Sequence, residues 1–278
     1  MKHIKLIFDL PEQYHEFFIS ELMELDFEGF EQFDETLEAY IEAGRYNDFS
    51  RELIEKLVMQ FPEAGFQETE AIEERNWNEL WEQSIQPQKI GRFLVKPTWS
   101  GAAAEEGEIV LEIDPKMAFG TGYHATTRLM LRQLDKIGFS GKTVLDAGTG
   151  TGILAIAALK LGAESAVGFD IDPWSERNAA ENFLLNGVEE SAEVRFGGME
   201  TLSKDEKFEV TLANINRNAL LELLPDLVFH TNDEGVILLS GLLQTDEPVV
   251  LERIAELGLL VSDKSTEEEW MLLQIRRK

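Results

Sequence analysis

The chain of 278 residues is long enough for one large α/β domain or two modest domains, and its 44% hydrophobic and 28% charged residues are typical of a folded protein with a buried core. It contains no cysteine, which excludes disulfides, thiolate nucleophiles, zinc fingers and iron–sulfur clusters. The four histidines are scattered without the spacing of metal ligands, so no metal site is predicted.

The formal net charge is −28, and the first 75 residues carry half of it, with 20 acidic and 6 basic side chains. Such a field repels nucleic acid and anionic lipid and attracts a basic protein, although acidity can also serve solubility alone. No apolar run approaches the roughly 20 residues of a membrane span, and the amino terminus lacks the features of a secretory signal. We therefore expect a soluble, cytoplasmic monomer with a basic protein partner, no nucleic-acid specificity and no membrane contact.

The first 70 residues predict a small, acidic α+β domain. Two helical patterns alternate with β-like runs, and a final strand is left open. The predicted elements are, in order, a strand at Ile4–Leu10, a helix at Glu12–Leu25, paired strands at Phe27–Phe33 and Thr36–Ile41, and a helix at Phe49–Phe61. This order resembles a ferredoxin-like sandwich, a fold that hosts many unrelated functions.

Residues 71–98 predict a helical and aromatic linker, in which Trp77 and Trp81 share one helix face. Residues 99–278 alternate short apolar runs with helical stretches, which indicates an α/β domain with a doubly wound, mostly parallel sheet. Only a few polar residues separate the last two runs, so these two strands should pair antiparallel. The predicted strands are Thr143–Asp146, Ala166–Asp170, Glu193–Phe196, Phe208–Ala213, Val236–Ser240, Leu259–Ser262 and Glu269–Ile275.

The most informative motif is TVLDAGTGTGILAIAALKLGA, in which a strand ends at Asp146 and a G-x-G-x-G turn leads directly into a helix. Gly148, Gly150 and Gly152 let the turn bend sharply and let a ligand lie against bare backbone at the carboxyl edge of the sheet. A dinucleotide-binding turn would instead read G-x-G-x-x-G, with its third glycine one residue later. The spacing therefore predicts a nucleoside-type cofactor and argues against a dehydrogenase, although such a turn can also form without a ligand.

The next strand ends in Asp170, 24 residues after Asp146 and close to the offset of roughly 20 expected for a ribose-binding carboxylate. A carboxylate at this place can accept hydrogen bonds from both ribose hydroxyls. Ile171 follows, where an apolar side chain could pack on a purine ring. Asp172 precedes Pro173 and is predicted to cap the next helix.

The fourth strand of this domain finishes at Asn214. The amide oxygen of an asparagine can accept a hydrogen bond from a substrate amine, and it orients the nitrogen without favouring the charged ammonium form. Capping of the following helix is the alternative role for this side chain. We interpret Asn214 as the candidate catalytic residue at the reactive end of the cofactor.

A second glycine-containing segment, AFGTGYHATTRLML, precedes the first strand of this domain. Gly120 and Gly122 permit a close approach of a ligand, and Thr126 and Thr127 fall in the first turn of a predicted helix, where free backbone N–H groups can bind a carboxylate. Local capping explains one of the two threonines equally well. His124 is interpreted as a loop histidine rather than a catalytic base.

The runs DAGTGTG, FDID and ANIN resemble those of class I S-adenosylmethionine-dependent methyltransferases, which have a seven-stranded, Rossmann-like sheet. With DPKMAFGTGYHATTRLML, LAIAALKLGA, DIDPW and KPTW, they make almost the whole chain similar to the ribosomal protein L11 methyltransferase (PrmA) family. The resemblance implies S-adenosylmethionine as cofactor, with Thr127 at its methionine end, Asp170 on its ribose and Asn214 beside the transferred methyl group. The full set of predicted cofactor contacts is Gly120, Thr127, Gly148, Gly150, Gly152, Asp170, Ile171 and Asn214.

The resemblance also implies methyl transfer to amino groups of ribosomal protein L11, both lysine ε-amines and the amino-terminal α-amine, with L11 free or on the large ribosomal subunit. The acidic domain at residues 1–70 would grip this basic substrate, and residues 99–278 would form the catalytic domain. Two alternatives remain: a non-catalytic, cofactor-sensing ribosome assembly factor, and a methyltransferase of nucleic-acid bases, which would need an aromatic residue after Asn214. The run after Asn214 departs from the family pattern, so Arg217 and Asn218 leave the substrate site undefined.

Overall fold

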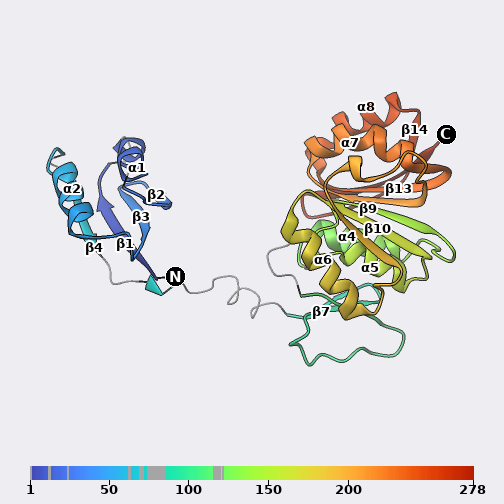
Figure 1. The fold of residues 1–278 in the computed structure, drawn as a ribbon. Coiled ribbons are helices and arrows are strands. Elements are labelled where there is room, and N and C mark those ends of the chain that lie inside the picture. Colours follow the sequence, from blue (N-terminus) through green and yellow to red (C-terminus); the bar gives the residue numbers. More distant parts are fainter. Residues whose placement is uncertain are drawn as a thin grey trace. The chain divides into compact units, whose positions relative to one another are not determined.

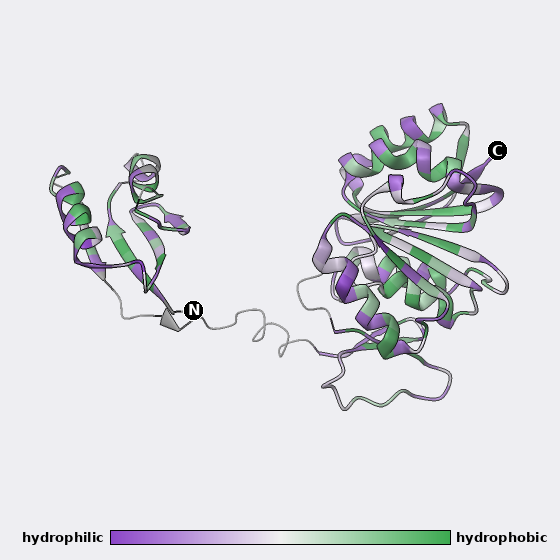
Figure 2. Cartoon of the chain, in the orientation of Figure 1, coloured by the Kyte–Doolittle hydropathy of each residue, from purple (hydrophilic) through white to green (hydrophobic). Residues whose placement is uncertain are grey.

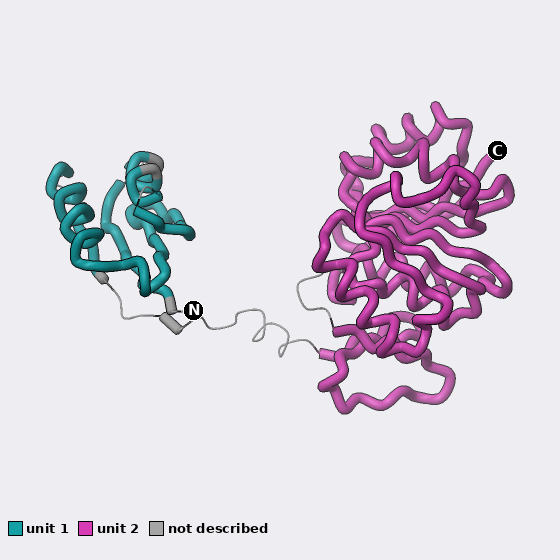
Figure 3. Tube along the Cα trace, viewed as in Figure 1, with its two compact units in different colours: residues 1–81 teal, residues 82–278 magenta. Residues whose placement is uncertain are grey.

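The computed structural model divides the chain into two compact units, residues 1–81 and residues 82–278, which Figure 3 draws in different colours. The residues that the structure describes are 2–11, 14–23, 25–61, 64–68, 72–73, 86–114, 120 and 122–278. Trp77 and Trp81, on which the predicted helical linker depends, lie outside these ranges. Within the described ranges, no helix is long and apolar enough to cross a membrane.

The amino-terminal unit is an antiparallel sheet with two helices on one face (Figure 1). Its elements are β1 (Lys2–Asp9), α1 (His15–Met23), β2 (Gly29–Phe33), β3 (Thr36–Glu42), α2 (Asp48–Val58), β4 (Gly65–Glu68) and β5 (Ile72–Glu73). The strand order is β2-β3-β1-β4, with β5 also paired to β1, which agrees with the predicted ferredoxin-like sandwich. Alternate strand residues such as Leu6, Phe8 and Leu37 are fully buried against Phe18 and Ile54 of the two helices.

The carboxy-terminal unit is built on the predicted seven-stranded sheet, in the order β11-β10-β9-β12-β13-β15-β14. Its strands are β9 (Thr143–Ala147), β10 (Ser165–Asp170), β11 (Ala192–Phe196), β12 (Phe208–Asn214), β13 (Thr231–Leu243), β14 (Leu259–Glu267) and β15 (Trp270–Arg277). The first five strands in this order are parallel, and β15 is antiparallel to both β13 and β14, as predicted for the last two strands of the chain.

Helices cover both faces of this sheet, as Figure 1 shows. They are α4 (Ala125–Leu134), α5 (Ile153–Lys160), α6 (Pro173–Asn186), α7 (Arg217–His230) and α8 (Glu247–Glu256). Buried side chains of α4, α5 and α6 form one core with the sheet, and those of α7 and α8 form a second core on the opposite face. The strands between these layers are largely hydrophobic (Figure 2), as expected for a parallel sheet covered on both sides.

This unit differs from the sequence prediction in the length of some strands and in an additional small sheet. The strand predicted at Val236–Ser240 extends over Thr231–Leu243, because its ends continue the ladders with β12 and β15. A small three-stranded sheet was not predicted, and it consists of β6 (Gln88–Ile90), β7 (Phe93–Lys96) and β8 (Ile109–Glu112). These strands are too short for a clear alternation of apolar and polar residues to indicate them.

Three asparagines on α6 connect this small sheet to the glycine turn. Asn178, Asn182 and Asn186 recur every four residues and are buried on one helix face. Asn186 exchanges two hydrogen bonds with the backbone of Glu112, at 3.0 and 2.7 Å. Asn182 accepts from the Asp114 backbone N–H at 3.0 Å and donates to the Thr151 carbonyl at 2.9 Å. Their spacing is the sequence signal that could have revealed this face, but it does not identify the backbone partners.

Candidate functional site

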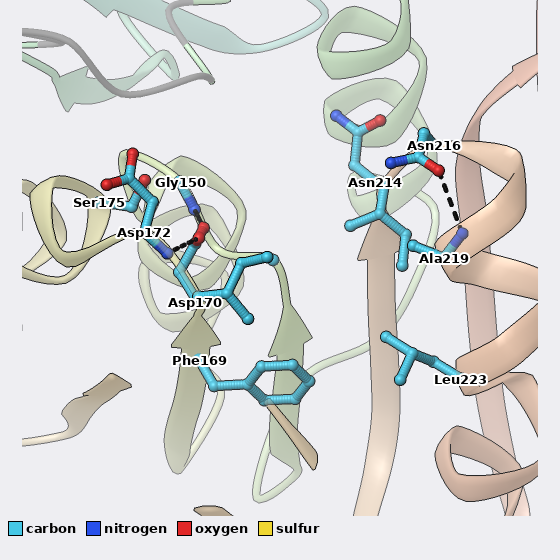
Figure 4. Close-up of a pocket in the computed structure, with 12 residues that line it drawn as sticks. Gly150, Phe169, Asp170, Asp172, Ser175, Asn214, Asn216, Ala219 and Leu223 are labelled. Carbon is cyan, nitrogen blue, oxygen red and sulfur yellow. Dashed lines mark hydrogen bonds between the residues drawn. The ribbon is translucent and has the colours of Figure 1, made fainter. Parts of the chain in front are cut away.

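A pocket of about 420 Å³ opens at the carboxyl edge of the seven-stranded sheet. The strand order reverses at β9, whose neighbours are β10 and β12, and ligands of open α/β sheets bind at such a switch point. Figure 4 shows the side chains that surround it. The lining residues are Gly148, Gly150, Phe169, Asp170, Ile171, Asp172, Ser175, Asn214, Ile215, Asn216, Ala219 and Leu223.

Two of the three predicted glycines expose their backbone to this pocket. Gly148 and Gly150 have φ angles of +70° and +55°, in the left-handed region that favours glycine. The Gly148 N–H donates to the carbonyl of Phe169 at 2.9 Å, which ties the turn to β10. Gly152 has a different role, because a Cβ there would lie 2.7 Å from the ring of Phe183 on α6. This third glycine permits close packing of the helices and is outside the pocket lining.

Asp170 presents a carboxylate to the pocket in a fixed orientation. One oxygen accepts from the Gly150 N–H at 2.9 Å, and the other accepts from the Asp172 N–H at 3.0 Å (Figure 4). Each carboxylate oxygen has two lone-pair sites, so both retain an acceptor position for a ligand. Ile171 beside it leaves 78% of its surface exposed although its side chain is apolar. Asp172 accepts from the Trp174 N–H at 3.0 Å and caps α6, as predicted.

The sequence left two roles open for Asn214, ligand binding and helix capping, and the structure assigns the capping role to Asn216. The side chain of Asn216 caps α7 by accepting from the Ala219 N–H at 3.1 Å. Asn214 therefore does not cap this helix. Its amide oxygen is buried and has no hydrogen-bond partner among the described residues. Such groups are rare because an unpaired buried acceptor costs about 1–3 kcal/mol, so this oxygen is suited to accept from a bound ligand.

Gly120, in the segment before α4, contacts the glycine turn and is not among the described residues that line the pocket. The carbonyl of Gly120 accepts from the Thr151 hydroxyl at 2.8 Å, and a Cβ at Gly120 would lie 2.6 Å from the same hydroxyl. His124 caps α4, because its Nδ1 accepts from the Thr126 backbone N–H at 3.3 Å, and the Thr126 hydroxyl lies 2.8 Å from the same atom. Thr126 thus has a local role, whereas the Thr127 hydroxyl is buried without a partner in the described part of the chain.

Arg217 and Asn218, at the start of α7, interact with neighbouring residues. The Arg217 guanidinium lies 3.0 Å from the Asp246 carboxylate. It also donates to the Asn218 amide oxygen at 3.0 and 3.2 Å. Neither residue lines the pocket, so their departure from the family pattern does not alter the pocket lining.

Asp146 is a buried carboxylic acid at the end of β9. Its side chain is fully enclosed and accepts from the Thr149 hydroxyl at 2.8 Å. Burial raises its pKa from 3.8 to about 6, and the nearby Asp170 charge adds to this effect. Hydrogen bonds from Thr149 and from the Ala155 backbone act in the opposite direction. Ionised Asp146 is consequently a destabilising group in the folded chain.

The pH dependence of stability tests this assignment through Asp146→Asn. The folded state holds the proton more tightly than the unfolded state, so the stabilisation is present at low pH and is lost as pH rises through about 6. Between about pH 4.5 and 7.5, the free energy of unfolding of the unmodified protein should fall by about 2 kcal/mol relative to the variant. Denaturant titrations at several pH values measure this difference. Asp205→Asn, at an exposed aspartate, controls for the change in net charge.

Seven residues of the pocket lining were not predicted from the sequence as ligand contacts, and two of them, Asp172 and Asn216, cap α6 and α7. Phe169, Ile215, Ala219 and Leu223 give it an apolar wall, and Ser175 lies in the first turn of α6. The predicted contacts Gly148, Gly150, Asp170, Ile171 and Asn214 do meet at this pocket, whereas Gly120, Thr127 and Gly152 lie outside its lining. The pocket combines bare backbone, an oriented carboxylate, an apolar wall and an amide oxygen that has no partner among the described residues. This combination suits a nucleoside cofactor whose reactive end lies next to a substrate amine.

This sheet, with a glycine turn after its central strand and an acidic residue ending the next, defines a class I S-adenosylmethionine-dependent methyltransferase. A family model described as ribosomal protein L11 methyltransferase (PrmA) matches residues 15–278, and the chain belongs to this family. The methyl donor is therefore S-adenosylmethionine. The side-chain oxygens of Thr127 and Asn214, which have no partner in the part of the chain that the structure describes, fit a cofactor that carries hydrogen-bond donors.

Curated relatives and a solved structure agree with the family match. The ribosomal protein L11 methyltransferase of Chlorobaculum parvum is 36% identical, over 99% of this chain and 97% of the relative. That of Porphyromonas gingivalis is 37% identical over the same shares. The crystal structure of the ribosomal protein L11 methylase of Lactobacillus delbrueckii subsp. bulgaricus has a TM-score of 0.65 and 32% identity, and the match covers 70% of this chain and 100% of that chain.

Proposed function

We propose that the protein transfers methyl groups from S-adenosylmethionine to amino groups of ribosomal protein L11, namely lysine ε-amines and the amino-terminal α-amine. The observation that carries this proposal is the amide oxygen of Asn214, which has no hydrogen-bond partner among the described residues and lies at the pocket of a chain that belongs to the L11 methyltransferase family. We further propose that it acts in the cytoplasm, because its proposed substrate is a ribosomal protein, and that it acts there as a monomer. L11 is methylated either free or on the large subunit.

The predicted contact residues have proposed roles toward the cofactor. Asp170 binds the two ribose hydroxyls through its remaining lone pairs, and Ile171 packs on the adenine ring. The backbone of Gly148 and Gly150 approaches the cofactor closely because no side chain intervenes. Thr127, whose hydroxyl has no partner among the described residues, binds at the methionine end. We include Gly120 and Gly152 as residues that hold the glycine turn in place.

The chemistry required of the protein is mainly orientation. The bound cofactor supplies a methyl group on a positively charged sulfur, which makes the carbon open to in-line displacement. Asn214 accepts a hydrogen bond from the attacking amine and aligns its lone pair, and good alignment can lower the barrier by roughly 7–11 kcal/mol. The neutral amide does not stabilise an ammonium ion, whereas a carboxylate would. The amine loses its proton to solvent before it enters the pocket.

Transfer of a labelled methyl group tests the proposed function. The purified protein is incubated with methyl-labelled S-adenosylmethionine and either L11 or ribosomal RNA, and the label is located by mass spectrometry. We expect label on lysine and amino-terminal amines of L11. Label on RNA alone would replace this proposal with a base methyltransferase. Cofactor binding without transfer to either substrate would favour the assembly-factor alternative.

The open face of the amino-terminal sheet is the proposed docking surface for L11. Side chains alternate across a strand, so the residues between the buried ones project away from α1 and α2. Glu31 on β2 is paired with Glu38 on β3, Asp9 ends β1 on the same face, and Lys5 on β1 forms an ion pair with Glu38 there. Tyr40 donates to Glu38 at 2.9 Å and to Glu31 at 3.3 Å. A face with these carboxylates suits a basic protein better than RNA.

The salt dependence of methylation tests this docking surface. We expect kcat/KM for L11 to fall roughly tenfold between 0.05 and 0.5 M salt, because screening weakens the attraction of opposite charges. Asp9→Asn combined with Glu31→Gln should lower kcat/KM at low salt and flatten this dependence. Glu189→Gln with Glu190→Gln is the control. It removes the same charge from the catalytic domain, in the exposed turn before the amino end of β11. Equal losses in both double variants would show that net charge, and not this face, attracts L11.

A further inference from the structure

Ile215, the residue after Asn214, is held between Gly148, in the turn after β9, and Gly241, in β13. On one side, a Cβ at Gly148 would lie 2.5 Å from the Cγ2 atom of Ile215. On the other side, a Cβ at Gly241 would meet the backbone of Ile215, first its carbonyl oxygen and then its carbonyl carbon at 2.7 Å and its nitrogen at 2.9 Å. Real Cβ atoms do not approach other atoms this closely, so both neighbours must lack a side chain for Ile215 to occupy its place.

Gly241 occupies a β-bulge beside Ile215, which lines the pocket. The pairing of β13 with β15 shifts between Leu239 and Leu242, so β13 has one extra residue at this point. Gly241 has a φ angle of +79°, which a left-handed glycine at a bulge adopts without strain. Ser240, directly before it, pairs with Asn214 on β12 and donates through its hydroxyl to the Met271 carbonyl at 3.0 Å. The bulge is thus anchored beside the candidate catalytic residue.

We propose that Gly241 is a positioning residue for methyl transfer. Its bare backbone sets the place of the Asn214–Ile215 peptide, and that peptide sets the direction of the Asn214 amide. This inference rests on the proposed function, because it gives Asn214 the role of orienting the amine. Gly241 belongs to none of the cofactor motifs in the sequence, and it is 27 residues beyond Asn214. Its contact with Ile215 forms because β12 and β13 are neighbours in the sheet, so the sequence alone does not indicate it.

A methyl group at position 241 would change the orientation of the amide more than the binding of the cofactor. The Ile215 backbone would have to move by about 1 Å to restore ordinary contact distances, and a misplacement of this size can reduce a rate about 10²-fold. Asp170, which is proposed to hold the ribose, and Gly150, which donates to it, belong to another strand and to the glycine turn. The three atoms nearest to a Cβ at Gly241 all belong to Ile215 and to neither of these residues.

Gly241→Ala and Gly258→Ala form a matched pair that tests the proposal. Gly258 also has a positive φ, +70°, but a Cβ there meets nothing within 4 Å, so its substitution adds the same backbone strain without a contact. We expect Gly241→Ala to lower kcat about 10- to 100-fold per folded molecule, with the cofactor Kd changed less than fivefold. Gly258→Ala should keep kcat within twofold. Equal kcat values in the two variants would overturn the proposal.

Ser240→Ala keeps the test decisive if Gly241→Ala does not fold. It removes the hydrogen bond to Met271 without adding an atom beside Ile215, and we expect kcat to fall threefold to tenfold. An unchanged kcat in this variant would also contradict the proposal. Hydrogen exchange of the peptide that contains Asn214–Asn216 provides a readout independent of activity. It should accelerate in the Gly241 and Ser240 variants but not in Gly258→Ala, and this comparison remains valid even if the unmodified protein methylates no L11.

Discussion

Asp170→Asn is expected to weaken the binding of S-adenosylmethionine by roughly 10²- to 10³-fold. The asparagine amide has one acceptor oxygen and one NH₂ group where the aspartate has two acceptor oxygens, so one proposed ribose hydrogen bond is lost and the other loses its charge. A charge-assisted hydrogen bond contributes about 1.5–3 kcal/mol, and each 1.4 kcal/mol corresponds to a factor of ten in Kd. Calorimetric titration with the cofactor measures the change directly.

Asp172→Asn is the matched control for this substitution. Asp172 also lines the pocket, and an asparagine can keep its role as the cap of α6. Both variants remove one negative charge near a cofactor that carries positive charge. If Asp172→Asn weakened binding as much as Asp170→Asn, the effect would be one of general electrostatics and the ribose contact would be wrong. Circular dichroism of both variants verifies that the fold is intact.

The parts of the fold that the sequence predicted are those with local signals. The glycine turn at residues 148–152, the strand ends at Asp170 and Asn214 and the helix cap at Asp172 each depend on a few consecutive residues. Because the carboxyl ends of parallel strands meet at one edge, predicting the strands was enough to place Asp170 and Asn214 near each other. The pocket lining contains both residues.

The parts that the sequence did not predict depend on contacts between distant segments. Asn214 and Asn216 are the same residue type two positions apart, and only the geometry assigns the helix cap to Asn216. Gly152 looks like a third ligand-binding glycine, but its position is determined by the packing of Phe183 from the next helix. The apolar wall at Leu223 comes from α7, whose helical pattern does not indicate which of its residues face a pocket.

Asn214→Ala is expected to reduce kcat for L11 methylation by about 10²- to 10³-fold. The variant removes the acceptor that is proposed to align the amine, and losses of this size are typical when one preorganised hydrogen-bonding group is removed from a site. The cofactor Kd should rise less than tenfold, because the proposed ribose and adenine contacts of Asp170 and Ile171 remain. Single-turnover rates with saturating cofactor separate the chemical step from binding.

Asn214→Asp and Asn216→Asp provide the sharper comparison, because the same chemical change is made two residues apart. An aspartate at 214 would favour the ammonium form of the substrate and raise its pKa, so the rise of the rate with pH should move to higher pH. An aspartate at 216 can still cap α7 and should leave both kcat and the pH profile nearly unchanged. If the Asn214→Asp profile instead coincides with that of the unmodified protein, Asn214 does not contact the amine.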